Sequence, residues 1–434
     1  MKGTIAALLC AMALLTGCAT SAGEVENLLR APQLSGQTSA IQKALNSYLG
    51  AGSTATLKYP ASGDFLSPFL FGDWDGDGVQ EAAVLYTAET AGTNVWLAVL
   101  EPTDNGWRVV QTAEGLSGEI ESVTTARLRD TDSSQILVGY GSGQDDRYLV
   151  VYLYSEEILQ PVIKRAYTDM VIGDMTGNEA TEDLVLALPT ETESGGVNLE
   201  LLTYIEGEFR AKQTLAVGAG SYNGCAALHA GQGLDGKPWL VLDGWAGSGG
   251  TSLSSNIVRY DEETGFLQLY TPPGVWDMYG VSQRYDTSLL SMDVDGNGTI
   301  DIPSEVGDGG ELRSPLDKRL KFLLWRDYAT PSGGHESFGV YDSEYRFFVP
   351  LPSGLHGRIL LRSNAGSTGW LVCSEDGETV YLEIRVVDAE PSQNRDTDYT
   401  RIANIGDQQL QARLVEPYFG LSMEKLTAGT VMIG

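Results

Sequence analysis

The chain has 434 residues, of which 42% are hydrophobic, so it can build a sizeable core and is not a disordered protein. Its 52 glycines and 9% aromatic residues favour an all-β protein with many tight turns over a helical one. The balance of 28 basic and 58 acidic residues gives a formal charge of −30, which argues against nucleic acid as a partner because such a surface repels phosphates.

Residues 1–17 have the pattern of a signal peptide. Lys2 precedes an apolar stretch that is too short to cross a membrane as a mature helix. The stretch ends in Leu-Thr-Gly-Cys, which resembles a bacterial lipobox whose cysteine, here Cys18, receives a diacylglyceryl group. This resemblance implies a lipoprotein that starts at Cys18, faces outward and is lipid-anchored to the bacterial cell membrane. The alternative is an ordinary secretory signal followed by an accidental cysteine.

Two further cysteines, Cys225 and Cys373, lie in the expected mature chain, each beside apolar residues. This context favours buried free thiols, although a disulfide is compatible with an oxidising compartment. The sequence contains no Cys-x-x-Cys pair, so a zinc or redox site gains no support.

Residues 18–34 lack a regular pattern and are predicted to be a tether, and residues 35–57 to form a helix with a lead-in to the main body. The helix is predicted from Ser35 to Leu49 because apolar residues recur at helical spacing before Gly50. The residues of this stripe are Ile41, Ala44, Leu45, Tyr48 and Leu49.

Beyond Leu57 the chain alternates between short apolar runs and turn residues, which predicts β-strands. The clearest runs are Ala82–Tyr86, Val95–Leu100, Trp107–Gln111, Tyr148–Tyr154, Leu184–Leu188, Leu199–Tyr204, Trp239–Leu242 and Phe266–Tyr270. Long helical patterns are missing before Pro315, which excludes doubly wound α/β folds.

An internal repeat runs through this region. FGDWDGDGVQEAAVLY begins at Phe71 and SMDVDGNGTIDIPS at Ser291, and weaker echoes begin at Leu128, Ile172 and Gly231. Their first loop positions are 73, 130, 174, 233 and 293, a mean step of about 55 residues. Such a step accommodates four short strands, the content of one propeller blade. Because one blade cannot cover its own sheet faces, we expect the units to close into a ring.

These motifs resemble the FG-GAP/VCBS-type repeats of bacterial surface proteins and of the integrin α-subunit propeller. The resemblance implies an all-β protein, a β-propeller of about six to seven four-stranded blades over residues 58–315. The last blade and a small C-terminal α+β extension are expected in residues 316–434. Two loops carry the full acidic pattern, and the other three are degenerate. Ser133 and Ser134 shorten the second loop and Lys237 and Pro238 disrupt the fourth, so we expect these two to serve as turns. In the extension we predict strands Phe347–Leu351, Arg358–Leu361, Trp370–Cys373 and Val380–Val387 and a short helix Leu421–Leu426.

The two complete loops are candidate Ca²⁺ sites. Each places side-chain oxygens at positions 1, 3, 5 and 9 and a backbone carbonyl at position 7, the hard-oxygen set that Ca²⁺ prefers, and a glycine at position 6 permits the sharp turn. The predicted ligands are Asp73, Asp75, Asp77, Val79 and Glu81 in the first loop and Asp293, Asp295, Asn297, Thr299 and Asp301 in the second. The alternative is a pair of solvated acidic turns.

We find no catalytic motif, and no catalytic residue is assigned. The three histidines, His229, His335 and His356, lie far apart in unlike contexts, and neither the zinc-protease pattern nor a Gly-x-Ser-x-Gly elbow occurs. Three aromatic residues, Trp245, Trp276 and Tyr279, are candidates for stacking on a sugar or peptide, and the competing interpretation is packing between blades.

These observations favour a non-catalytic, calcium-binding surface protein that binds or scaffolds a glycan or another protein. The alternative is a carbohydrate-active enzyme, a polysaccharide lyase or hydrolase, or an accessory module of one. A purely structural role in the cell envelope is a third possibility.

Overall fold

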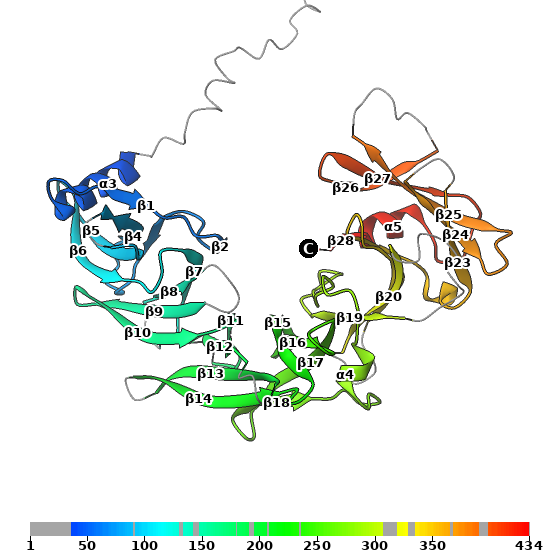
Figure 1. The fold of residues 1–434 in the computed structure, drawn as a ribbon, viewed down its shortest axis with the longest axis horizontal. Coiled ribbons are helices and arrows are strands. Elements are labelled where there is room, and N and C mark those ends of the chain that lie inside the picture. The colour runs from blue at the N-terminus through cyan, green and yellow to red at the C-terminus, as the bar shows by residue number, and fades with distance from the viewer. Residues whose placement is uncertain are drawn as a thin grey trace, which may run out of the picture.

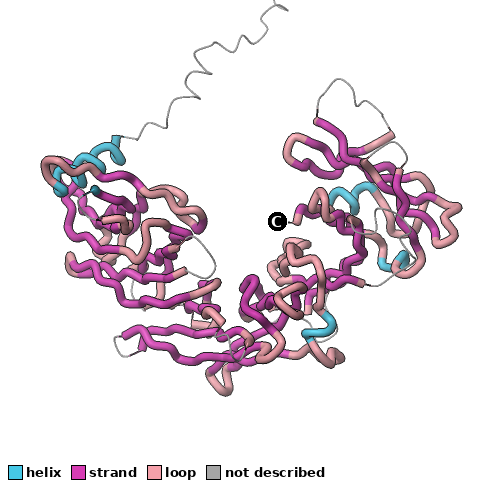
Figure 2. The backbone as a smooth tube through the Cα atoms, viewed as in Figure 1, coloured by secondary structure: helices cyan, strands magenta, loops and turns pink. Residues whose placement is uncertain are grey.

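The computed structural model describes residues 36–89, 92–129, 133–141, 147–178, 180–190, 195–205, 208–233, 236–306, 319–328, 335–364, 368–389 and 398–433. The predicted signal peptide, Cys18 and the tether therefore lie outside the described residues. Within these ranges the protein is all-β with a few helices, as the sequence predicts, and strands dominate the backbone trace (Figure 2).

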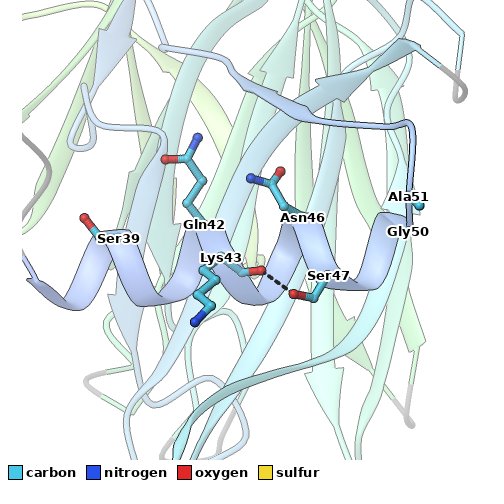
Figure 3. A pocket seen from close by; sticks show the side chains of 7 residues that line it. All are labelled: Ser39, Gln42, Lys43, Asn46, Ser47, Gly50 and Ala51. Carbon is cyan, nitrogen blue, oxygen red and sulfur yellow. Dashed lines mark hydrogen bonds between the residues drawn. The ribbon is translucent and has the colours of Figure 1, made fainter.

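The predicted amino-terminal helix is confirmed as α3 (Gly36–Leu49). Ile41 and Leu45, four residues apart on one face, are completely buried against the first sheet. The opposite face is polar and exposed, and there Ser47 donates a hydrogen bond to the carbonyl of Lys43 (Figure 3). The side chain of Asn46 accepts a hydrogen bond from the N–H of Ala55 at 2.9 Å, which ties the helix to the first strand.

The first three sheets follow one another in chain order, and all strand pairs within them are antiparallel except β2–β7. Their strands are β1 (Ala55–Leu57), β3 (Phe69–Gly72), β4 (Glu81–Ala88), β5 (Trp96–Thr103) and β6 (Gly106–Glu114) in the first sheet; β2 (Ser62–Gly63), β7 (Ile120–Ala126), β8 (Gln135–Tyr140), β9 (Tyr148–Ser155) and β10 (Ile158–Ala166) in the second; and β11 (Asp169–Gly173), β12 (Asp183–Ala187), β13 (Val197–Ile205) and β14 (Glu208–Val217) in the third.

Three more antiparallel sheets complete the described chain. Their strands are β15 (Tyr222–Gln232), β16 (Pro238–Ala246), β17 (Ser252–Asp261) and β18 (Phe266–Tyr270) in the fourth sheet; β19 (Asp301–Glu305), β20 (Leu320–Asp327), β21 (Glu336–Asp342), β22 (Phe347–Pro350) and β28 (Val431–Met432) in the fifth; and β23 (Ile359–Ser363), β24 (Trp370–Ser374), β25 (Val380–Asp388), β26 (Thr400–Ile405) and β27 (Gln408–Leu414) in the sixth.

All eight predicted strand runs before residue 271 coincide with strands except at Val95 and Leu188, and the four predicted runs of the C-terminal region do so except at Leu351 and Arg358. The short C-terminal helix is α5 (Met423–Gly429), close to the predicted Leu421–Leu426. Two shorter helical segments are α4 (Met278–Val281) and η4 (Ser353–Leu355). The predicted domain boundary at residue 315 lies outside the described residues, between β19 and β20 of one sheet.

Consecutive sheets pack face to face. Along β4, Ala83 and Leu85 point into a core shared with Val138 of β8, whereas Ala82 and Val84 point into the core beneath α3. Because a neighbour covers each face, both sets of alternating side chains are buried, and the strand is a continuous apolar run. The same pairing of neighbouring faces recurs along the chain, through Leu137 with Leu184 and Val185 with Leu240, for example.

The six sheets follow an open arc (Figure 1). The strands β11, β15 and β19 lie toward the inside of the arc, and β10, β14 and β18 toward its outside. The first and last sheets stand apart at the two ends, and the C-terminus lies inside the arc. The arc therefore carries blade-like units in sequence order without the ring closure that the repeat predicts.

Candidate metal centres

The first acidic loop joins β3 to β4. Asp73 folds the loop by accepting hydrogen bonds from the N–H groups of Gly76 at 2.7 Å and Gly78 at 2.9 Å. Asp77 accepts one from the N–H of Val79 at 2.7 Å. A Cβ at Gly78 would meet no atom within 4 Å, so glycine is required there by its φ of +87° and not by lack of space.

This folding brings four carboxylates together. Asp73, Asp75, Asp77 and Glu81 each offer an oxygen, and these oxygens lie within 4.8 Å of one another. Asp73, Asp75 and Asp77 come from the loop itself, whereas Glu81 is the first residue of β4 and is buried. The predicted side-chain ligands of the first loop are therefore assembled, and the arrangement suits a divalent cation that takes oxygen ligands. The carbonyl of Val79 stays a predicted ligand.

Burial of Glu81 has an electrostatic consequence. Its carboxylate accepts a hydrogen bond from the N–H of Trp74 at 2.7 Å, which favours the charged form. Desolvation outweighs this bond and, with the charges of Asp75 and Asp73, raises the pKa of Glu81 to about 7. A cation among these carboxylates would reverse that balance, because it offsets both the burial of charge and the mutual repulsion.

The second acidic loop repeats this design. Asp293 accepts hydrogen bonds from the N–H groups of Gly296 and Gly298, both at 2.8 Å, and Asn297 accepts one from the N–H of Thr299 at 2.7 Å. Gly298 has a φ of +88°, matching its counterpart in the first loop. Oxygens of three carboxylates lie within 4.8 Å of one another, those of Asp293, Asp295 and Asp301. The roles of Asn297 and Thr299 as ligands stay predictions.

Asp301 is the buried acid of the second loop and has no exposed surface. Its Oδ2 accepts a hydrogen bond from the N–H of Val294 at 3.1 Å, and its Oδ1 is buried without a partner among the described residues. Desolvation, assisted by the charges of Asp295 and Asp327, raises the pKa of Asp301 to about 7. Burying a carboxylate oxygen without a hydrogen-bond partner costs free energy. Coordination of a cation by Oδ1 would offset this cost.

Four of the five repeat loops share one hydrogen bond. In each, a buried side-chain oxygen at the start of a strand accepts from the backbone N–H seven residues earlier. The acceptors Glu81, Gln135, Asp183 and Asp301 pair with the N–H groups of Trp74, Leu128, Thr176 and Val294, respectively. Three of these loops join paired neighbouring strands, β3 to β4, β7 to β8 and β11 to β12, and the isolated bridge between Met292 and Asp301 encloses the fourth. The echoes found in the sequence therefore occupy equivalent places in successive sheets.

The three degenerate loops retain different parts of the acidic-loop pattern. Within the described residues, acidic groups of three or more occur only in the two complete loops. Asp174 of the third loop is described and has a buried Oδ1 without a partner, whereas Asp130, Asp132 and Asp235 lie outside the described residues. In the fourth loop, Gly233 donates to the carbonyl of Lys237 at 2.7 Å, which closes a tight hairpin turn.

The three aromatic candidates differ in exposure. Trp276 is 99% exposed in the segment before α4. Tyr279, in α4, packs on the ring of Tyr222 with 5.9 Å between centroids. Trp245, in β16, is half-buried beside Gly250. Of the three, Trp276 presents a free ring to solvent, and the other two take part in packing.

The two cysteines outside the predicted signal region are free thiols. Cys225 and Cys373 are buried in different sheets.

A buried ion pair was not predicted from the sequence. Asp243 pairs with Arg284, but the two residues are 41 positions apart and neither belongs to a recognisable motif. The sequence signal is limited to Asp243, an acid directly after the apolar run Leu240–Leu242, because polar residues flank Arg284.

Comparisons with known proteins add no family. No family model matches the sequence, and no curated protein matches it. Among solved structures, a protein from Lactobacillus plantarum aligns with a TM-score of 0.28 and 11% identity over 69% of this chain and 80% of that one. A likeness at this level carries no argument about function. No helix in the described part of the chain has the length and apolar character that a bilayer crossing needs.

Proposed function

We propose that this protein is a calcium-stabilised β-propeller, built from FG-GAP/VCBS-like repeats, that acts as a non-catalytic binding or scaffold protein on the outer face of a bacterial membrane. Its ligand would be a glycan or another protein. The observation that carries the calcium part is the pair of acidic loops, in which a buried acid, Glu81 or Asp301, lies among loop carboxylates whose oxygens converge within 4.8 Å. Ca²⁺ suits such oxygen-only sites at the surface of extracellular modules.

The propeller part is supported by the order of the sheets. Six sheets, antiparallel except for the pair β2–β7, succeed one another, each packs on the next, and loops that share one hydrogen bond recur in four of them. Radial repetition of this kind is how propellers protect sheet faces that a single unit leaves open. Ring closure is the part of this proposal that the open arc of Figure 1 leaves to experiment.

The surface part is supported by the sequence alone. The lipobox-like Leu-Thr-Gly-Cys motif places the proposed anchor at Cys18, and the charge of −30 suits a protein exposed to solvent. The test is Cys18→Ala in the full-length protein, followed by detergent-phase partitioning. Loss of the variant from the detergent phase supports the anchor, and unchanged partitioning contradicts it.

The binding part is tested against the enzymatic alternative in one assay. The full-length protein is incubated with a panel of polysaccharides and surface proteins, and both retention and the release of reducing or unsaturated ends are measured. Retention without release supports a binding protein. Release of new ends at a rate that scales with protein concentration would instead assign a lyase or hydrolase. Trp276→Ala is the first variant to compare, because the ring of Trp276 is freely exposed for stacking on a sugar.

A further inference from the structure

A cavity of about 730 Å³ lies between the fifth sheet, the turn after β22 and helix α5. Its volume is within the roughly 300–1,000 Å³ that small-molecule sites occupy. Its lining includes Val294 and Asp295 of the second acidic loop but no residue of the first acidic loop and not Trp276. Its walls come from segments that are distant in the chain, from Val294 to Gly429.

The floor of the cavity is apolar and rigid. Phe338 of β21 and Phe348 of β22 contribute rings that are 3% and 1% exposed, and Leu426 of α5 is 1% exposed. The helix approaches this sheet closely because Gly429 has no side chain, and a Cβ there would lie 2.8 Å from Pro350. The floor is therefore built from core residues whose positions are fixed by packing.

Phe419 stands at the rim of the cavity with 97% of its surface exposed. It occupies a tight turn in which the N–H of Leu421 donates to the carbonyl of Tyr418 at 3.1 Å and Gly420 has a φ of +86°. The ring of Tyr418 packs on Tyr381 with 5.3 Å between centroids, which anchors the turn to the sixth sheet. The structure thus holds a large apolar ring in water beside an apolar floor.

Charged side chains of both signs line the cavity. Glu336 pairs with Arg326, and Asp295 of the second acidic loop lies 3.3 Å from Nδ1 of His335. Lys425 of α5 also lines the cavity, and its ammonium group has no carboxylate partner among the described residues. Lys425 therefore offers a cation to a ligand in the cavity, beside the exposed ring of Phe419 and the buried rings of the floor.

We propose that this cavity binds a small aromatic anion, a carboxylate or sulfonate whose ring lies between Phe419 and the apolar floor while its charged group meets Lys425. Aromatic rings gain from burial and from stacking or edge contacts with other rings. A charge-assisted hydrogen bond from the ammonium group fixes the orientation of the anion. This site goes beyond the proposed surface function; Asp295 of the second acidic loop is among its lining residues, but the side chains assigned to the ligand, Phe419 and Lys425, are not part of that loop.

The experiment uses the full chain carrying Cys18→Ala, so that no lipid is attached and no detergent competes for the probes. Fluorescence titrations compare 1-anilinonaphthalene-8-sulfonate, an aromatic anion, with N-phenyl-1-naphthylamine, a neutral ring system of similar size. Phe419→Ala and Lys425→Gln are measured beside Trp276→Ala, the matched control that removes an equally exposed ring outside the cavity.

We expect one saturable site for the anionic probe in the parent. Phe419→Ala should lower the affinity for both probes by roughly tenfold, because it removes one wall of the site that holds the ring. Lys425→Gln should weaken binding of the anionic probe by about threefold to fivefold, because an exposed ion pair contributes only a small binding free energy. The affinity for the neutral probe should not change. Trp276→Ala should change neither. Non-saturable binding in the parent, or equal affinities in Phe419→Ala and Trp276→Ala, would overturn the proposal. An unchanged anionic affinity in Lys425→Gln would overturn the preference for an anion.

Discussion

Oδ1 of Asp243 lies 2.8 Å from Nη2 of Arg284, and neither side chain has any exposed surface. The carboxylate also accepts hydrogen bonds from the hydroxyl groups of Ser255 at 2.6 Å and Ser291 at 2.7 Å, and from the N–H of Ser291 at 2.6 Å. Asp243 is in β16 and Ser255 in β17, whereas Arg284 and Ser291 lie in the segment that leads to the second acidic loop. The pair therefore fastens that segment, and with it the loop beginning at Asp293, to the fourth sheet.

Loss of this carboxylate charge should destabilise the protein strongly. Asp243→Asn leaves the guanidinium of Arg284 buried without its counter-charge, and breaking a buried pair from one side costs about 3–5 kcal/mol. We expect a clear fall in the urea midpoint. The matched control is Glu208→Gln, which breaks an exposed pair with Arg210 and should leave the midpoint unchanged. Equal midpoints for the two variants would contradict a structural role for the buried pair.

The same pair predicts a pH dependence. Burial alone would raise the pKa of Asp243, but the charge of Arg284 and the contact with His229 lower it below its ordinary value. A depressed folded-state pKa contributes stability that is present above the unfolded-state pKa of about 3.9 and is lost as the pH falls below it. The difference in urea midpoint between the parent and Asp243→Asn should therefore stay constant from neutral pH to about pH 5 and narrow below about pH 4. A difference that stays constant into strong acid would show that the charge of Asp243 does not carry the effect.

The sequence predicted those parts of the molecule that local pattern encodes. The stripe that includes Ile41 and Leu45 predicted α3, and alternating or continuous apolar runs predicted the strands, because both kinds of period follow from backbone geometry. The carboxylates of the acidic loops lie within nine positions of one another, so their convergence is a local property as well. Gln135 is instructive, since its place in the second loop becomes recognisable only through its hydrogen bond to Leu128.

The remaining features depend on contacts between distant segments. Asp243 is in the fourth sheet and Arg284 in the segment between the fourth and fifth sheets. No spacing rule predicts a contact between them. The cavity beside Phe419 requires α5 to pack on β22, which follows from the shapes of Leu426, Gly429 and Pro350 together. Ring closure was inferred from the need to cover sheet faces. In Figure 1 the first and last sheets stand apart, and the shared cores lie between consecutive sheets.

Calcium should stabilise the protein, and the two loops should contribute unequally. Binding to the folded form alone contributes RT ln(1 + [Ca²⁺]/Kd), about 1–3 kcal/mol per site at a tenfold to hundredfold excess. The first loop has four clustered carboxylates and the second has three, so the cation is attracted more strongly to the first. We expect EDTA to lower the melting temperature, and Asp75→Ala to remove more of the calcium-dependent shift than Asp295→Ala. Thermal unfolding at fixed ionic strength, with Mg²⁺ as the screening control, measures both. An equal melting temperature in millimolar Ca²⁺ and in EDTA would identify the loops as ordinary acidic turns.

Replacing the buried acid of the first loop should have opposite effects with and without calcium. Glu81→Gln keeps an acceptor for the N–H of Trp74, as Gln135 does naturally for Leu128 in the next sheet at 2.8 Å. Without calcium, the change removes one of four crowded carboxylates and the burial of its charge, so the melting temperature in EDTA should rise by about 2–4 °C. With calcium, it removes a ligand charge, so the stabilisation by millimolar Ca²⁺ should shrink. Gln135→Glu is the matched reverse change and should lower the melting temperature in EDTA, because it buries a carboxylate at a completely buried position. If Glu81→Gln lowered the melting temperature equally in EDTA and in Ca²⁺, Glu81 would be a structural acceptor and not a metal ligand.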